Sequence, residues 1–146
     1  MRAIGILHII FLSLLPFTTA PVKAQSPGTK PIYPIEFKAG AKTAIVEGTV
    51  SPPKTVGPDM TNEGSERYTL SVRAGQSFSM VISSDNHQAG FSVEKPYHAG
   101  SNFEFVTKGG VQRWSGRLTE SGDYTIIVFP LDRESVSRFK LRITLR

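Results

Sequence analysis

The stretch "RLTESGDYTIIVFP", residues 117–130, combines a polar turn with a strand that is apolar on both of its faces. Ser121, Gly122 and Asp123 favour a turn, because Gly takes up a positive φ without steric cost and Asp bonds to nearby backbone. From Tyr124 onward, β-branched and aromatic residues predict a strand. Because residues 126–129 are apolar at every position, this strand is predicted to lie in the centre of a sheet.

Outside this stretch, apolar residues recur at every second position in short runs separated by Gly, Pro, Asn, Asp and Ser. Such runs are typical of half-buried antiparallel strands, and no stretch sustains a helical period. Together with 124–130, the predicted strands are residues 44–50, 67–73, 76–83, 90–94, 102–106, 111–118 and 138–146. We expect 67–73 and 76–83 to form a hairpin. About eight strands with this spacing predict an all-β fold, a single antiparallel β-sandwich.

The first residues have the pattern of a secretory signal peptide. Met1 and Arg2 are followed by an apolar stretch and then by small residues that end in Val22-Lys23-Ala24. This pattern predicts cleavage after residue 24 and a mature protein that is periplasmic or secreted. A transmembrane anchor is the alternative, but the apolar run is short for a span of roughly 20 residues. The sequence contains no cysteine, so attachment to lipid through cysteine is excluded.

Removal of residues 1–24 leaves 146 − 24 = 122 residues, a length that fits one domain with one core. Residues 25–34 are rich in Pro and small polar side chains and predict an extended, flexible arm. The sandwich domain is therefore expected to cover 35–146. Without disulfides, apolar packing must hold this domain together.

The net charge is modest. The chain has 17 Lys and Arg against 12 Asp and Glu, and loss of Arg2 and Lys23 leaves 15 − 12 = +3. This charge and the predicted export argue against a nucleic-acid partner. The solvent face of 138–146 carries Lys140, Arg142 and Arg146. These cations are interpreted either as protection of an edge strand against pairing or as a docking surface for an acidic partner.

The sequence offers little for catalysis or metal binding. Ser83, Ser84, Asp85 and His87 are close neighbours in one stretch, whereas the members of a catalytic triad usually come from separate elements. We interpret this stretch as a polar turn and predict no enzymatic activity. Calcium and zinc ligands are too scattered for a site, so neither a metal nor another cofactor is predicted.

Two aromatic residues are candidates for a binding surface. Trp114 is the sole tryptophan, and a sandwich often buries one in its core. An exposed Trp114 would instead stack on a sugar or anchor a protein partner. Tyr97 lies in the loop sequence "KPYHAGS" and is the aromatic residue more favoured for exposure.

The order of these elements resembles the bacterial pre-peptidase C-terminal type of β-sandwich over residues 35–146. The resemblance rests on Tyr68, on "AGQ" at residues 74–76, and on Leu118 followed by Ser-Gly-Asp-Tyr at residues 121–124. Within that group, an exported chain without an attached protease is similar to the periplasmic inhibitors of goose-type (g-type) lysozyme. That resemblance implies a sandwich that inserts loops into the cleft of a lysozyme.

The same resemblance implies which residues bind the partner. Ser121, Gly122, Asp123 and Tyr124 correspond to the Ser-Gly-x-Tyr element, and Arg133 is a basic loop residue that would approach the acidic catalytic region of the enzyme. From turn chemistry alone, the element is a structural turn whose Tyr124 hydroxyl fixes a neighbouring loop, as in a tyrosine corner. A glycan- or envelope-binding module without inhibitory activity is the alternative function, with Tyr97 or Trp114 as the contact.

Overall fold

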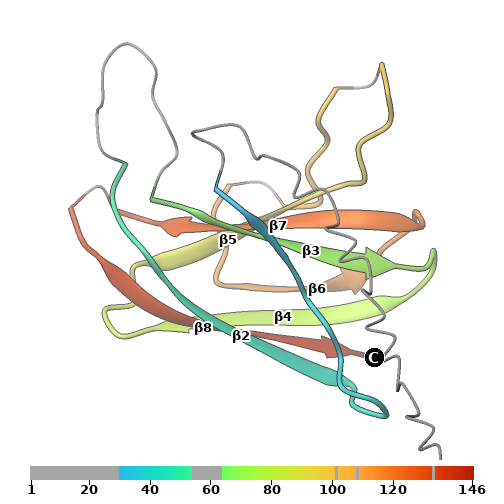
Figure 1. The fold of residues 1–146 in the computed structure, drawn as a ribbon, viewed down its shortest axis with the longest axis horizontal. Helices are drawn as coiled ribbons and strands as arrows, with labels where there is room; N and C mark the ends of the chain where they lie inside the picture. Colours follow the sequence, from blue (N-terminus) through green and yellow to red (C-terminus); the bar gives the residue numbers. More distant parts are fainter. Residues whose placement is uncertain (1–29, 54–63, 101, 108, 133) are drawn as a thin grey trace, which may run out of the picture.

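The computed structural model describes residues 30–53, 64–100, 102–107, 109–132 and 134–146. These residues form two four-stranded sheets that pack as the two layers of a sandwich (Figure 1). The first sheet has the strand order β1 (Ile32–Pro34), β3 (Glu66–Val72), β7 (Gly122–Pro130) and β5 (Ala89–Glu94). The second has the order β2 (Thr43–Val50), β8 (Ser137–Leu145), β4 (Ser77–Ser84) and β6 (Arg113–Arg117). The predicted all-β sandwich of about eight strands is confirmed.

β7 is a central strand, as its apolar run predicts. It pairs antiparallel with β3 on one side, where Tyr68 lies opposite Ile126, and with β5 on the other, where Phe91 lies opposite Val128. All other strand pairs are antiparallel too, except β1, which runs parallel to β3.

The core lies between the sheets and is built by the alternation of each strand. In β8, the odd-numbered residues from Ser137 to Ile143 are buried and Arg138, Lys140 and Arg142 are exposed. The apolar side chains with no exposed surface come from both layers: Val50, Met80, Phe91, Val93, Ile126, Val128, Leu141 and Ile143. Burial of large aliphatic and aromatic side chains contributes roughly 1.5–3 kcal/mol each, which explains how the domain folds without disulfides.

The predicted hairpin of 67–73 and 76–83 is wrong, because β3 and β4 belong to different sheets. Gly75, with a φ of 88°, turns the chain from one layer to the other instead of back along the same sheet. Leu70 of β3 and Met80 of β4 therefore point into the core from opposite sheets, and they are 1% and 0% exposed. The central strands β7 and β8 take up the hydrogen bonds that a hairpin would have used.

Two further strand predictions need correction. β8 lies between β2 and β4, so its outward cations do not protect an edge. Residues 102–106 form no strand beyond an isolated bridge between Glu94 and Phe105, and Phe103 and Phe105 are 68% and 52% exposed. An alternating pattern predicts a strand only where one face has a layer to pack against, and these aromatic side chains have none.

The N-terminal boundary also differs from the expectation. The last three residues of the predicted arm, Ile32–Pro34, form β1 and pair with Arg67, Tyr68 and Thr69. The predicted signal peptide, residues 1–24, and residues 25–29 of the arm lie outside the described residues. In the described part of the chain, no helix has the length and apolar character needed to span a membrane.

Candidate partner-binding site

Residues 121–124, where the chain enters β7 and which we call the 121–124 turn, consist of Ser121 and the first three residues of β7. The predicted turn is wrong for Gly122 and Asp123, which pair with Val72 and Ser71 of β3, and the segment is fixed by its tyrosine. Tyr124 is 1% exposed, and its hydroxyl accepts a hydrogen bond from the backbone N–H of Glu120 and donates one to the carbonyl of Glu120, both at 3.2 Å. A buried ring whose hydroxyl bonds the backbone a few residues upstream is a tyrosine corner. The predicted structural role of Tyr124 is thus confirmed, and its ring is covered by the fold.

The other residues of the 121–124 turn bond to elements distant in sequence. The Ser121 hydroxyl accepts from the backbone N–H of Ala74 at 2.8 Å, and a carboxylate oxygen of Asp123 accepts from the Ser71 hydroxyl at 2.6 Å. The turn is therefore tied both to the end of β3 and to the connection between β3 and β4. Ser121 and Asp123 remain exposed despite these bonds.

Gly122 is required at its position for two reasons. Its φ of 142° lies in a region that side chains rarely occupy, and a Cβ there would come within 2.9 Å of the Pro96 ring. The glycine thus allows the loop after β5 to approach the 121–124 turn closely. This contact joins the turn to the loop that carries Tyr97.

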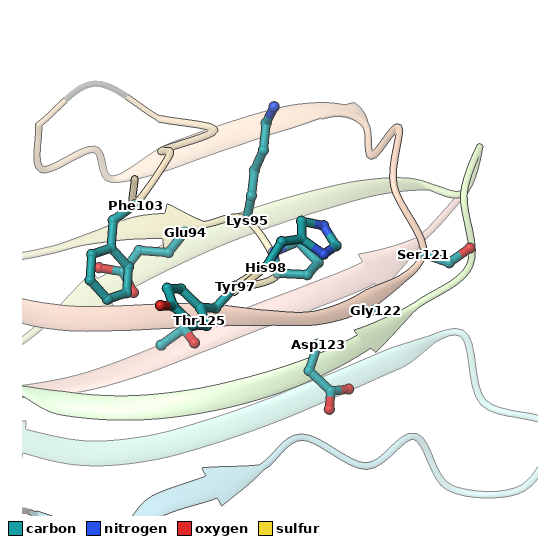
Figure 2. A pocket seen from close by; sticks show the side chains of 10 residues that line it. Glu94, Lys95, Tyr97, His98, Phe103, Ser121, Gly122, Asp123 and Thr125 are labelled. Carbon is teal, nitrogen blue, oxygen red and sulfur yellow. The ribbon is translucent and has the colours of Figure 1, made fainter. Parts of the chain in front are cut away.

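Together the turn and that loop enclose a groove of about 430 Å³ (Figure 2). Tyr97 and Phe103 are 63% and 68% exposed, and their ring centroids lie 5.4 Å apart, so the predicted exposure of Tyr97 is confirmed. Figure 2 shows Ser121 and Asp123 standing apart from this aromatic pair. The groove is lined by Glu94, Lys95, Pro96, Tyr97, His98, Phe103, Ser121, Gly122, Asp123 and Thr125.

A charged cluster borders the groove. Lys95 Nζ lies 2.7 Å from a carboxylate oxygen of Glu104 and 3.1 Å from one of Glu120, whose second oxygen lies 3.3 Å from His98 Nε2. The hydrogen bonds to Glu104 and Glu120 raise the pKa of Lys95 to about 12, and those from Lys95 and His98 lower the pKa of Glu120. Sequence reasoning missed this cluster, because Glu120 is 22 residues from His98, Glu104 is 9 from Lys95, and no local pattern joins them.

Arg133 itself lies outside the described residues, but its neighbours place its loop in the fold. Asp132 follows the end of β7, where its carboxylate accepts from the backbone N–H of Glu134 at 3.2 Å and of Ser135 at 2.8 Å. The 121–124 turn stands at the start of the same strand. β7 has nine residues, which at roughly 3.3 Å per residue span about 26 Å. The structure therefore does not bring these two predicted contact regions together.

The stretch that holds the only local candidates for catalysis is a turn between β4 and β5, as predicted. The carboxylate of Asp85 accepts from the backbone N–H of Arg138 at 3.1 Å, and the Ser84 hydroxyl accepts from that of Ala89 at 3.2 Å. His87 has a positive φ of 59°, which suits a tight turn. Among the residues that the structure describes, no three His, Cys, Asp or Glu side chains gather in a way that could hold a metal ion.

Trp114 is partly buried and packs against the core from β6. Its ring covers Gly116, where a Cβ would come within 2.6 Å of it. The core interpretation of Trp114 is thus favoured over that of an exposed anchor, and the aromatic surface near the turn belongs to Tyr97 and Phe103.

The fold matches solved structures of known proteins, whereas no protein-family model and no curated protein sequence matches the chain. PliG of Aeromonas hydrophila, a periplasmic inhibitor of g-type lysozyme, matches with a TM-score of 0.59 and 23% identity over 79% of this chain and 96% of that protein. The corresponding inhibitor of Salmonella Typhimurium gives 0.55 and 16%, over 81% and 100%.

A structure from the other expected group matches as well. The pre-peptidase C-terminal domain of a Bacillus anthracis collagenase gives a TM-score of 0.51 and 10% identity, over 80% of this chain and 97% of that domain. The chain therefore has the β-sandwich fold of the PliG inhibitors and of pre-peptidase C-terminal domains, the two groups that its sequence resembles.

Proposed function

We propose that this protein is an exported, non-enzymatic binding protein that inhibits g-type lysozyme. The observation that carries the proposal is a preorganised turn, 121–124, beside an aromatic groove on the fold of the PliG inhibitors. The signal-peptide pattern of residues 1–24 and the periplasmic location of PliG support a periplasmic or secreted site of action.

In the proposed mechanism, the 121–124 turn enters the sugar-binding cleft of the lysozyme and blocks it. Because its bonds to Ala74 and Ser71 already fix the turn, binding loses little conformational entropy. Ser121 and Asp123 make the contacts, and Tyr124 acts from beneath by holding the turn in place. The exposed rings of Tyr97 and Phe103 supply the apolar anchor that binding surfaces commonly need.

Arg133 is the alternative candidate for the contact with the cleft of the enzyme. An arginine that pairs with the acidic catalytic residue of the enzyme would form a charge-assisted, two-pronged hydrogen bond, which stabilises a complex when both groups are well satisfied. Asp132 and Glu134 lie at the opposite end of β7 from the 121–124 turn, about 26 Å away, so the two loops would contact different parts of the enzyme. We assign the cleft contact to the turn and treat Arg133 as the alternative to be tested.

The direct test is the lysis of peptidoglycan by g-type and chicken-type lysozymes, followed by turbidity, with and without residues 25–146 of this protein. Selective protection against the g-type enzyme is the expected result. Equal lysis with and without the protein, at concentrations well above that of the enzyme, would refute inhibition.

A glycan-binding module is the second candidate, and the exposed pair Tyr97 and Phe103 favours it, because exposed aromatic rings can stack on the apolar faces of sugars. Cosedimentation with insoluble peptidoglycan in the absence of lysozyme separates the two functions. Binding that is lost in Tyr97→Ala, combined with no protection against lysis, would establish the module. Protection without cosedimentation would establish the inhibitor.

A further inference from the structure

The outer face of the second sheet carries four arginines at the corners of a regular grid. In the first row, Arg142 of β8 lies opposite Val81 of β4, which lies opposite Arg113 of β6. In the last row, Ser77 pairs with Arg117 and its carbonyl accepts from the backbone N–H of Arg146 at 2.8 Å. All four arginines are exposed. We call this surface the arginine face: Arg113, Arg117, Arg142 and Arg146 with the residues between them.

The centre of the arginine face is a row of hydroxyl groups. Thr144, Ser79 and Ser115 lie opposite one another on β8, β4 and β6. The Ser115 hydroxyl donates to that of Ser79 at 3.0 Å, and the Thr144 hydroxyl lies 3.3 Å from that of Thr43 on β2. A hollow of about 500 Å³ adjoins this row, lined by Ser77, Phe78, Ser115, Gly116, Arg117 and Arg146.

Within the described part of the chain, these four charges have no acidic partners. On this sheet, Glu47 pairs with Lys140 at 2.8 Å and Asp85 lies 4.0 Å from Arg138, both toward the other end of β8. Among the described residues, no ion pair involves any of the four corner arginines. β6 is an edge strand of this sheet, but β8 lies between β2 and β4, so protection of a strand edge does not explain the arginines that β8 contributes.

The spacing of the grid points to a ligand with several anionic groups. Two inter-strand steps separate β8 from β6, roughly 10 Å, and four residues along each strand separate its two arginines, roughly 13 Å. One inorganic anion cannot occupy all four corners at these separations. Arginine presents a planar fork that matches phosphate, and hydroxyl groups between the corners suit the hydroxyls of a sugar chain.

We propose that the arginine face binds a polysaccharide that carries phosphate groups. A lipid bilayer is disfavoured, because peripheral membrane binding adds inserted apolar side chains and the centre of this grid holds hydroxyls. A nucleic acid is disfavoured as well, since single strands are bound with stacking aromatic rings and the grid has none. The site is separate from the groove beside the 121–124 turn and does not depend on the inhibition of lysozyme.

The test measures binding of residues 25–146 to phosphorylated dextran by titration calorimetry, with uncharged dextran of the same length as the matched polymer. We expect binding to the phosphorylated polymer only, and affinity that falls as salt rises. The double variant R113Q/R142Q should weaken binding about tenfold or more. R113K/R142K, which keeps the charges without the forked geometry, should lose less.

Two control variants are compared with R113Q/R142Q. The first removes the same number of charges elsewhere, and the second removes one charge on the same face of the sheet. K30Q/K38Q changes the N-terminal segment outside the arginine face, and K140Q removes a cation that Glu47 already neutralises. Both controls should bind phosphorylated dextran with an affinity within about twofold of that of the unchanged protein. Equal losses in R113Q/R142Q and K30Q/K38Q would overturn the proposal, as would binding to phosphatidylglycerol vesicles but not to phosphorylated dextran. Protection against lysozyme, measured on R113Q/R142Q in parallel, should be unchanged.

Discussion

The two ends of β7 are held in different ways. At its start, the 121–124 turn bonds to Ser71 and Ala74, about 50 residues earlier in the chain, and Gly122 touches Pro96. At its other end, the carboxylate of Asp132 bonds to the backbone N–H groups of Glu134 and Ser135, while the backbone N–H of Leu131 donates to the carbonyl of Gln88 at 2.8 Å. The side chains of the first segment therefore bond to β3 and to the β3–β4 connection, whereas in the second loop the long-range bonds go to the backbone of Leu131 and Val136 and the Asp132 side chain bonds within the loop. The difference indicates that the exposed side chains at the start of β7, Ser121 and Asp123, are held by long-range bonds and are suited to present a fixed shape to a partner.

The largest effect is expected for Tyr124→Ala, at the start of β7. Removal of a fully buried aromatic ring should lower the free energy of unfolding by about 3–5 kcal/mol, because a cavity replaces the side chain. Thermal or urea unfolding measures the loss. Tyr124→Phe, which keeps the ring and loses both bonds to Glu120, should cost about 1–2 kcal/mol. If Tyr124→Phe is as stable as the unchanged protein, the two bonds to Glu120 do not stabilise the fold and the prediction is wrong.

Gly122→Ala tests the close contact with the loop after β5. The variant combines an unfavourable φ with a clash against Pro96, so we expect a loss of about 1–3 kcal/mol in urea unfolding. Gly40→Ala is the matched control, because Gly40 has a φ of 75° and open space around it. It should cost about 1 kcal/mol from backbone strain alone. Equal losses at both positions would show that the Pro96 contact is not tight.

Ser121→Ala removes the hydrogen bond between the Ser121 hydroxyl and the backbone N–H of Ala74 and leaves the path of the backbone unchanged. The exposed N–H of Ala74 can turn to water, so a loss of about 0.5–1.5 kcal/mol is expected. Hydrogen exchange at the Ala74 amide should accelerate in this variant relative to the amides of β7. If the Ala74 amide exchanges as fast in the unchanged protein as in Ser121→Ala, the bond does not hold the turn.

The smallest effect concerns pH at the other end of β7. Hydrogen bonds from Ser135 and Glu134 lower the pKa of Asp132, so the ionised carboxylate stabilises the fold above its unfolded pKa of about 3.8. That contribution is lost as the pH falls through the lower, folded pKa. Asp132→Asn should therefore be less stable than the original at pH 7, and the difference should shrink at low pH. A difference that is the same at both pH values would contradict this role.

The features that sequence patterns predict well are the local ones. The central position of β7 follows from its apolar run, and the tyrosine corner follows from the tyrosine directly after Ser-Gly-Asp, although Gly122 and Asp123 themselves belong to β7 and not to a turn. In both cases the decisive residues are neighbours in the chain. The all-β class follows likewise from repeated alternation and turn signals.

The features that depend on the choice of partner strand are not predictable in this way. The turn at Gly75 is compatible with a hairpin and with a crossing between sheets, and only the pairing of β3 with β7 decides between them. The central place of β8, the groove beside Tyr97 and the separation of the 121–124 turn from the Arg133 loop all follow from that long-range pairing. No local pattern in the chain specifies it.

The most direct test of the account is inhibition of g-type lysozyme by one variant from each end of β7. Asp123→Arg and Arg133→Glu change the charge by the same amount in opposite directions, and circular dichroism is to be used to check that both variants fold. The account predicts that Asp123→Arg weakens inhibition about tenfold or more, while Arg133→Glu retains it within about twofold. Loss of inhibition in Arg133→Glu alone would contradict the account and move the contact to the other end of the strand.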